Sequence, residues 1–142
     1  MLNDQLRMTG ALTVKKNGKV VREIHNLVVA GGKELVASRL AGGGVDVSHM
    51  AIGTSTLAAS VEQTALTTEL DRNSLATAGG VAAANTVEFA ASWGEGDGTG
   101  AVTEAGLFTA ATGGTMLART VFPVVNKTAT DFITITWTIT IS

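Results

Sequence analysis

The chain carries an unbroken alternating stretch, Ile133-Thr134-Ile135-Thr136-Trp137-Thr138-Ile139-Thr140-Ile141. Successive side chains of a β-strand point to opposite faces, so this stretch places its apolar side chains on one face and its threonines on the other. We expect a strand over residues 131–141 whose apolar face joins a hydrophobic core. The threonine face is polar but uncharged, so it costs little to cover with a second layer or a partner protein.

Runs of β-branched residues between turn signals indicate further strands. Asn17-Gly18 predicts a hairpin between strands at 10–16 and 19–24, because a type I′ turn requires positive φ at both central positions. Other strands are expected at 49–53, 66–75, within 81–93, at 102–108 and at 116–122. One short helix is expected near residues 32–41. The predicted fold class is mainly β, an antiparallel β-sandwich that resembles a jelly roll.

The composition is that of one globular domain. We expect a single β-sandwich domain over residues 1–142, with a short N-terminal arm of about residues 1–8. The absence of cysteine excludes disulfides and thiolate metal sites. A net charge of -2, with 15% charged residues, predicts neither a nucleic-acid nor a membrane partner. No apolar run is long enough to span a bilayer and no signal peptide is apparent, so we expect synthesis in the cytoplasm.

Residues able to perform chemistry are sparse. His25 and His49 are the two histidines, and without cysteine they make a poor metal site, so we predict no metal, no cofactor and no enzymatic activity. In the segment 94–100, Gly occupies every second position. A phosphate loop would precede a helix, whereas a strand is expected here, and a calcium loop needs more ligands than Glu95 and Asp97. This segment is expected to be either a mobile loop or a contact for a neighbouring subunit.

Four charged residues in predicted strands are candidates for structural ion pairs: Glu69, Arg72, Glu104 and Arg119. Carboxylates of this kind can also serve in acid-base chemistry, but no nucleophile or metal-ligand pattern accompanies them. Arg72 and Arg119 are candidates to meet Glu69 or Glu104, and we expect one such pair to be largely buried.

Several motifs follow one another in a fixed order along residues 26–142. They are Asn26-Leu27-Val28-Val29-Ala30-Gly31-Gly32, Met50-Ala51-Ile52-Gly53-Thr54, Thr64-Ala65-Leu66-Thr67-Thr68-Glu69-Leu70-Asp71-Arg72, Thr103-Glu104-Ala105-Gly106-Leu107-Phe108, Gly113-Gly114-Thr115-Met116-Leu117-Ala118-Arg119 and the Ile/Thr strand. In this order they resemble small structural proteins of tailed bacteriophages, found as tail-fibre or baseplate-associated domains. Similar β modules serve as capsid decoration (cement) proteins. The resemblance implies a part of a virion and brings no catalytic residues.

A fibre protein usually has a trimerising shaft or a second receptor-binding domain, and neither is recognisable here. We therefore expect a virion-located capsid decoration protein that bridges shell subunits as a homo-oligomer, with the major capsid protein as partner. The alternative is a tail-fibre or baseplate-associated protein whose partners are tail proteins. A less favoured alternative is a carbohydrate-binding β module, for which Trp93 beside the glycine-rich segment is the candidate platform.

The candidate partner contacts come from the N-terminal arm, the first hairpin, the glycine-rich segment, the connection before the last strand and the threonine face. They are Met1, Leu2, Asn17, Lys19, Trp93, Glu95, Asp97, Lys127, Thr134, Thr136 and Thr138.

Overall fold

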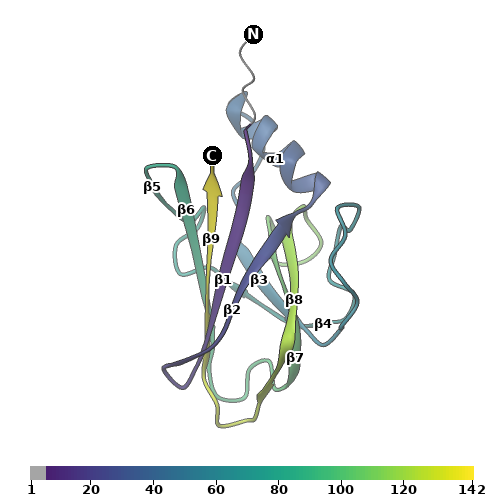
Figure 1. Ribbon diagram of the computed structural model, residues 1–142, viewed down its shortest axis with the longest axis vertical. Helices are drawn as coiled ribbons and strands as arrows, with labels where there is room; N and C mark the ends of the chain where they lie inside the picture. The colour runs from purple at the N-terminus through teal and green to yellow at the C-terminus, as the bar shows by residue number, and fades with distance from the viewer. Residues whose placement is uncertain (1–5) are drawn as a thin grey trace.

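The computed structural model describes residues 6–142, except for the side chains of residues 26 and 27. This part of the chain forms nine strands and one helix (Figure 1). The strands are β1 (Met8–Lys16), β2 (Lys19–Val28), β3 (His49–Gly53), β4 (Glu69–Ser74), β5 (Val81–Ala83), β6 (Thr86–Trp93), β7 (Gly100–Phe108), β8 (Met116–Lys127) and β9 (Ile133–Ile141), and the helix α1 spans Ala30–Leu40. The prediction of a mainly β, antiparallel, sandwich-like fold with one short helix is confirmed.

The strands form two sheets that share β2. One sheet has the order β2-β1-β9-β6-β5 and the other β4-β3-β7-β8-β2. Residues 19–26 of β2 pair with β1, whereas only Leu27 and Val28 pair with β8. Beyond that contact β2 and β8 diverge (Figure 1), and Arg22 bridges the gap by donating hydrogen bonds to the carbonyl oxygens of Pro123 at 2.9 Å and Val124 at 2.6 Å.

The hydrophobic core lies between the two sheets. β9 buries Ile133, Ile135, Trp137 and Ile139 at 0–2% exposure, as its alternation predicts. The facing sheet contributes side chains such as Met50, Ile52, Val102, Leu107, Leu117 and Phe122. The threonines of β9 are half-buried on the outer face, where β1 and β6 flank the strand on both sides.

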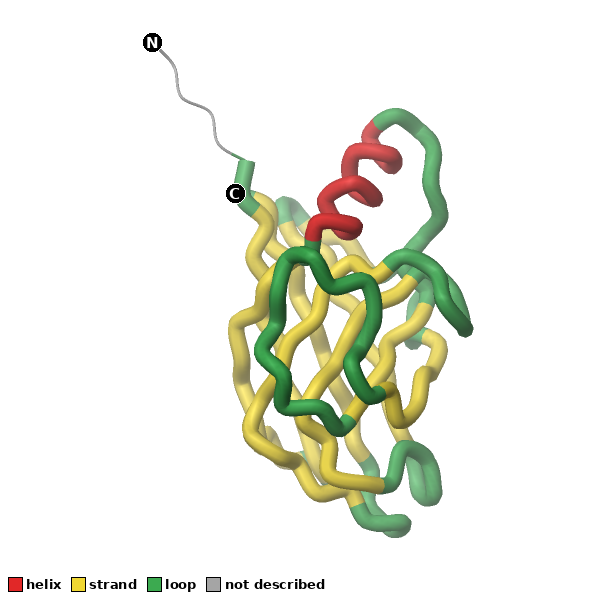
Figure 2. Tube along the Cα trace, turned by 90° about the vertical axis from the view of Figure 1, so that its right-hand side faces the viewer, coloured by secondary structure: helices red, strands yellow, loops and turns green. Residues whose placement is uncertain are grey.

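A long loop, residues 54–68, forms a third layer over the outer face of the β3-β7-β8 sheet. Figure 2 shows it in front of the strands of this sheet. Leu66 from this loop packs in a second apolar cluster with Val29, Ala51, Phe108 and Met116. The expected strand over 66–75 is therefore shorter than predicted, because its first part belongs to the loop and only β4 pairs with β3.

The strand expected within 81–93 is present as β6, and a second strand that was not expected, β5, precedes it. The two form a hairpin joined through Ala84, whose φ is +52°. The strand expected at 116–122 is longer than predicted. β8 continues past residue 122 through Pro123 to Lys127. Proline is tolerated there because the β7-β8 register shifts at this point and β2 has already diverged.

The helix begins at Ala30 rather than near residue 32 and ends at Leu40. No side chain caps its N-terminus, and only Gly32 is fully buried. A Cβ at Gly32 would overlap the carbonyl group of Leu117, so glycine allows α1 to approach β8 closely. The helix is thus positioned by its contact with β8 rather than by its own capping.

Candidate functional site

A buried ion pair joins β7 and β8 on the outer face of their sheet. Glu104 and Arg119 are both 0% exposed, and Glu104 Oε1 lies 3.1 Å from Arg119 Nη2. Arg119 Nε donates a further hydrogen bond to the same oxygen at 3.1 Å. The structure therefore pairs two of the four charged residues that the sequence singled out, and the pair is fully buried.

The Glu104 carboxylate also accepts hydrogen bonds from the backbone of loop 54–68. The N–H groups of Ser55, Thr67 and Thr68 donate to it at 2.9, 3.0 and 2.9 Å. A buried carboxylate is stable only when such donors compensate for its lost hydration. Glu104 consequently fastens both ends of the loop to the sheet.

Arg119 fastens the middle of the same loop. Its guanidinium donates to Gln63 Oε1 at 3.0 Å and to the carbonyl oxygen of Leu57 at 2.9 Å. Gly53, directly before the loop, is required by close approach, because a Cβ there would overlap the Thr68 carbonyl and the Glu104 carboxylate. We call this set of contacts the buried lock.

The second charged pair, Glu69 and Arg72, lies on β4 next to the lock. Arg72 Nη2 is 2.6 Å from Glu69 Oε1, and the guanidinium carbon stacks 3.7 Å from the centre of the Phe108 ring. Arg72 Nη1 also donates to the carbonyl oxygens of Ala110 and Gly113 at 3.0 and 2.9 Å. This arginine holds the β7–β8 turn against β4.

At one end of the sandwich, the hairpin turn at 17–18, loop 94–99 and the connection 128–132 form what we call the polar end. Asn17 donates its side-chain N–H to Asp131 at 2.9 Å and accepts the Phe132 N–H at 2.9 Å. The pKa of Asp131 is held well below its ordinary value. The largest cause is this bond from Asn17, followed by the bonds from the N–H and hydroxyl of Thr128 and by the nearby charge of Lys16. The amide of Asn17, a predicted partner contact, is occupied within the chain.

The structure corrects the prediction that Lys127 is a partner contact. Its side chain is 2% exposed, and its Nζ donates to the carbonyl oxygen of Gly94 at 2.7 Å. The N–H of Gly96 donates to the carbonyl oxygen of Ala129 at 2.8 Å. The glycine-rich segment is therefore tied to the 128–132 connection, with Glu95 and Asp97 exposed.

Trp93 is not a surface platform. It is 0% exposed in the core, and Gly98 folds over it so closely that a Cβ there would lie 3.1 Å from Trp93 Cδ1 and 2.7 Å from Ile52 Cδ1. Its indole nitrogen has no hydrogen-bond partner among the described residues. The large apolar surface of the ring is buried in the core instead of facing solvent. The carbohydrate-binding alternative thereby loses its proposed platform.

The other predicted contacts are placed as follows. Lys19 is exposed at the polar end. Thr134, Thr136 and Thr138 are half-buried on the outer face, and Thr134 Oγ1 lies 3.1 Å from Ser92 Oγ. Met1 and Leu2 lie outside the described residues.

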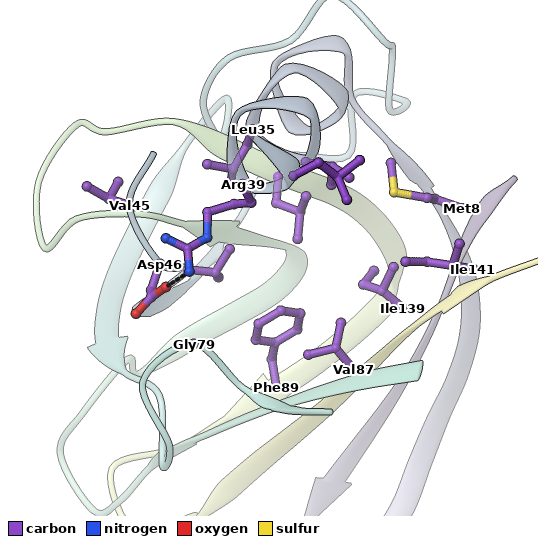
Figure 3. A pocket seen from close by; sticks show the side chains of 14 residues that line it. Met8, Leu35, Arg39, Val45, Asp46, Gly79, Val87, Phe89, Ile139 and Ile141 are labelled. Carbon is purple, nitrogen blue, oxygen red and sulfur yellow. Dashed lines mark ion pairs between the residues drawn. The ribbon is translucent and has the colours of Figure 1, made fainter. Parts of the chain in front are cut away.

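The opposite end of the sandwich contains an apolar hollow of about 390 Å³ beneath α1 (Figure 3). Leu35 from the helix faces Val87, Phe89 and Ile139 from the sheet across this space. Arg39 and Asp46 form an exposed ion pair at its rim, with Nη2 and Oδ1 3.1 Å apart. Sequence reasoning missed the hollow, because its walls come from strands distant in the chain and their apolar residues read simply as core.

The histidines do not come together. His49 Nδ1 lies 2.7 Å from Ser48 Oγ and its Nε2 3.4 Å from Ser74 Oγ, while His25 lies exposed on β2. Within residues 6–142, no three acidic or histidine side chains are placed to hold a metal ion. In the same range, no helix is long and apolar enough to cross a lipid bilayer.

Comparison with known proteins adds no relative: no family model, no curated protein and no solved structure matches the chain. The inference of function therefore depends on the residues and contacts described above.

Proposed function

We propose that this chain is a non-enzymatic structural protein of a tailed-bacteriophage virion. The favoured role is that of a capsid decoration (cement) protein, which bridges neighbouring shell subunits as a homo-oligomer bound to the major capsid protein. A protein that binds only the assembled shell stabilises that state by mass action. The alternative role is in a tail fibre or baseplate.

The observation that carries the proposal is the location of the phage-like motifs. Gly53, Thr67, Glu104 and Arg119 each come from a different motif of the ordered series, and all four meet in the buried lock. In this chain the shared order of motifs thus corresponds to one set of contacts that holds a loop on a sheet. That correspondence supports a scaffold role, because the motif residues are used to build the fold.

The shape of the molecule favours a bridging role over a fibre role. A bridge needs two contact surfaces, and the sandwich has ends of opposite character, one polar and one with an apolar hollow. The hairpin turn between β1 and β2 lies at one end and α1 at the other (Figure 1). Separate neighbours can therefore contact the two ends without competing.

The test is the location of the protein in particles. Phage particles from cells that carry the gene are purified, separated into heads and tails, and analysed by quantitative mass spectrometry. We expect the protein in heads, at a fixed ratio to the major capsid protein, and heads lacking it should open at a lower temperature. Recovery from tails alone would favour the alternative role. Absence from both fractions would overturn the proposal.

A further inference from the structure

Two hollows meet beneath the C-terminal half of α1. The apolar hollow described above shares Met8, Val36 and Leu40 with a second hollow of about 480 Å³. Leu6 and Ala37 are among the residues that line the second hollow. We call the two together the α1 groove. Its combined walls are mostly apolar, and each hollow is within the size range of ordinary binding pockets.

The most exposed large apolar side chains of the described chain surround this groove. Leu40 is 81% exposed, Leu6 is 73% exposed and Val45 is 59% exposed, and each lines one or both hollows. Isolated exposed leucines are common, but a cluster around a groove is typical of a surface that another molecule covers.

The charges around the groove discriminate between possible occupants. Arg7 and Lys33 line the second hollow, and neither forms an ion pair with a carboxylate of residues 6–142. Arg39 lines the first hollow and pairs with Asp46, the one carboxylate among the described residues that line either hollow. The rim is therefore cationic, although the whole chain has a net charge of -2. A second copy placed symmetrically here would bring the same cations into contact, whereas an acidic partner would be attracted.

We propose that the α1 groove binds a segment of another protein in which apolar side chains are flanked by Asp or Glu. The apolar side chains enter the space between α1 and Met8, and the carboxylates meet Arg7 and Lys33. The inference depends on the groove alone, so it holds whichever assembly contains the protein, and it is tested on the purified chain.

The first experiment selects random peptides, displayed on their own mRNA, against the immobilised protein. We expect enriched peptides that combine apolar residues with Asp or Glu. Ala37→Trp, which fills the second hollow from an exposed helical position, should abolish the enrichment. Leu57→Trp is the matched control, because Leu57 is 58% exposed and lines neither hollow, and it should leave the enrichment intact.

The second experiment measures the affinity of an enriched peptide by fluorescence anisotropy. The double variant Arg7→Glu/Lys33→Glu should weaken binding about tenfold at low salt, and the difference should shrink as salt screens the charges. The control Lys15→Glu/Lys19→Glu makes the same change in net charge at the other end of β1 and should bind normally. Circular dichroism checks that all variants are folded.

Three outcomes would overturn the proposal. The first is the absence of any enrichment that Ala37→Trp removes. The second is a set of enriched peptides without acidic residues. The third is concentration-dependent self-association of the wild-type chain that Leu40→Asp prevents, because this would make a second copy the occupant of the groove.

Discussion

Loop 54–68 and helix α1 both cover the sandwich without belonging to its sheets, yet they are held in opposite ways. The loop is fastened by two fully buried charges and the hydrogen bonds that compensate them. The helix packs through the close approach at Gly32 and through partly buried Leu35 and Val36, and its first residue, Ala30, donates its N–H to the carbonyl oxygen of Val61 at 2.8 Å. The charged groups that hold the loop are buried inside the molecule, whereas α1 leaves Leu40, Lys33 and Arg39 at the surface. The contrast separates a part that builds the fold from a part that is available to a partner.

The largest expected effect comes from breaking the buried lock. Arg119→Met leaves Glu104 buried without its cation, and removing one partner of a buried pair costs about 3–5 kcal/mol. Urea unfolding should show that loss of stability, and loop 54–68 should become sensitive to protease.

The matched control for this prediction is Arg72→Met, since its partner Glu69 retains 36% side-chain exposure and stays hydrated. Its loss should be smaller than that of Arg119→Met. The double variant Glu104→Gln/Arg119→Met should recover part of the stability, because no buried charge remains. An equal loss of stability in Arg119→Met and Arg72→Met would contradict the importance of the buried ion pair.

Two adjacent glycines of α1 should respond in opposite directions. Gly32→Ala forces a Cβ against the Leu117 carbonyl and should destabilise the fold by about 1–3 kcal/mol. At Gly31 the nearest atoms to an added Cβ lie at 3.6 and 3.7 Å, so Gly31→Ala should stabilise by up to about 1 kcal/mol through helix propensity. Thermal unfolding measures both, and a shift in the same direction would contradict the packing of α1 on β8.

Asp131 gives the polar end an acid-sensitive contribution. Its pKa is depressed in the folded state, so its stabilisation is complete above the ordinary carboxyl pKa of about 3.9 and is lost as pH falls through the lower folded value. Asp131→Asn should therefore lower the melting temperature at pH 7. The difference in melting temperature between the variant and the wild type should disappear as the pH falls below about 4. A difference in melting temperature that stays constant from pH 7 to strongly acidic conditions would contradict a stabilising role of the Asp131 carboxylate.

The smallest effect is expected at the groove rim. Arg39 and Asp46 have side chains 52% and 56% exposed, and such pairs contribute about 0.5 kcal/mol or less. Asp46→Asn should leave urea unfolding almost unchanged at both low and high salt. A loss comparable to that of Arg119→Met would show that α1 is fastened like the loop, and the contrast between them would disappear.

The sequence allowed the strands with strong local signals to be predicted. The alternation of β9 and the Asn17-Gly18 turn, with φ of +53° and +82°, depend on neighbouring residues and appear in the structure as expected. The turn at Ala84 and Asn85 was missed because its positive φ falls on the alanine, a residue that rarely adopts it, and no glycine accompanies the asparagine.

The site was less predictable, because its geometry depends on contacts between distant segments. Glu104 and Arg119 were candidates for pairing, but nothing local shows that both become fully buried beneath loop 54–68. Trp93 and Lys127 were assigned to the surface from their neighbours in sequence, whereas the polar end folds over both of them. The α1 groove requires α1 and the strands β1, β2, β6, β8 and β9 to meet, and it has no signature in any one of them.

Where β2 and β8 diverge, their edges could pair with strands of another molecule. An open strand edge is a template for another chain, and a protein packed in many copies on one particle would be exposed to that hazard. Here Arg22 occupies the carbonyl groups of Pro123 and Val124, and the chain's one proline removes a donor from the same edge. At the ends of the strand order, β5 has three residues, and β4 has six, of which all but Leu70 are charged or polar. Each of these edges is therefore a poor template for strand addition by another copy, which disfavours edge-to-edge polymerisation.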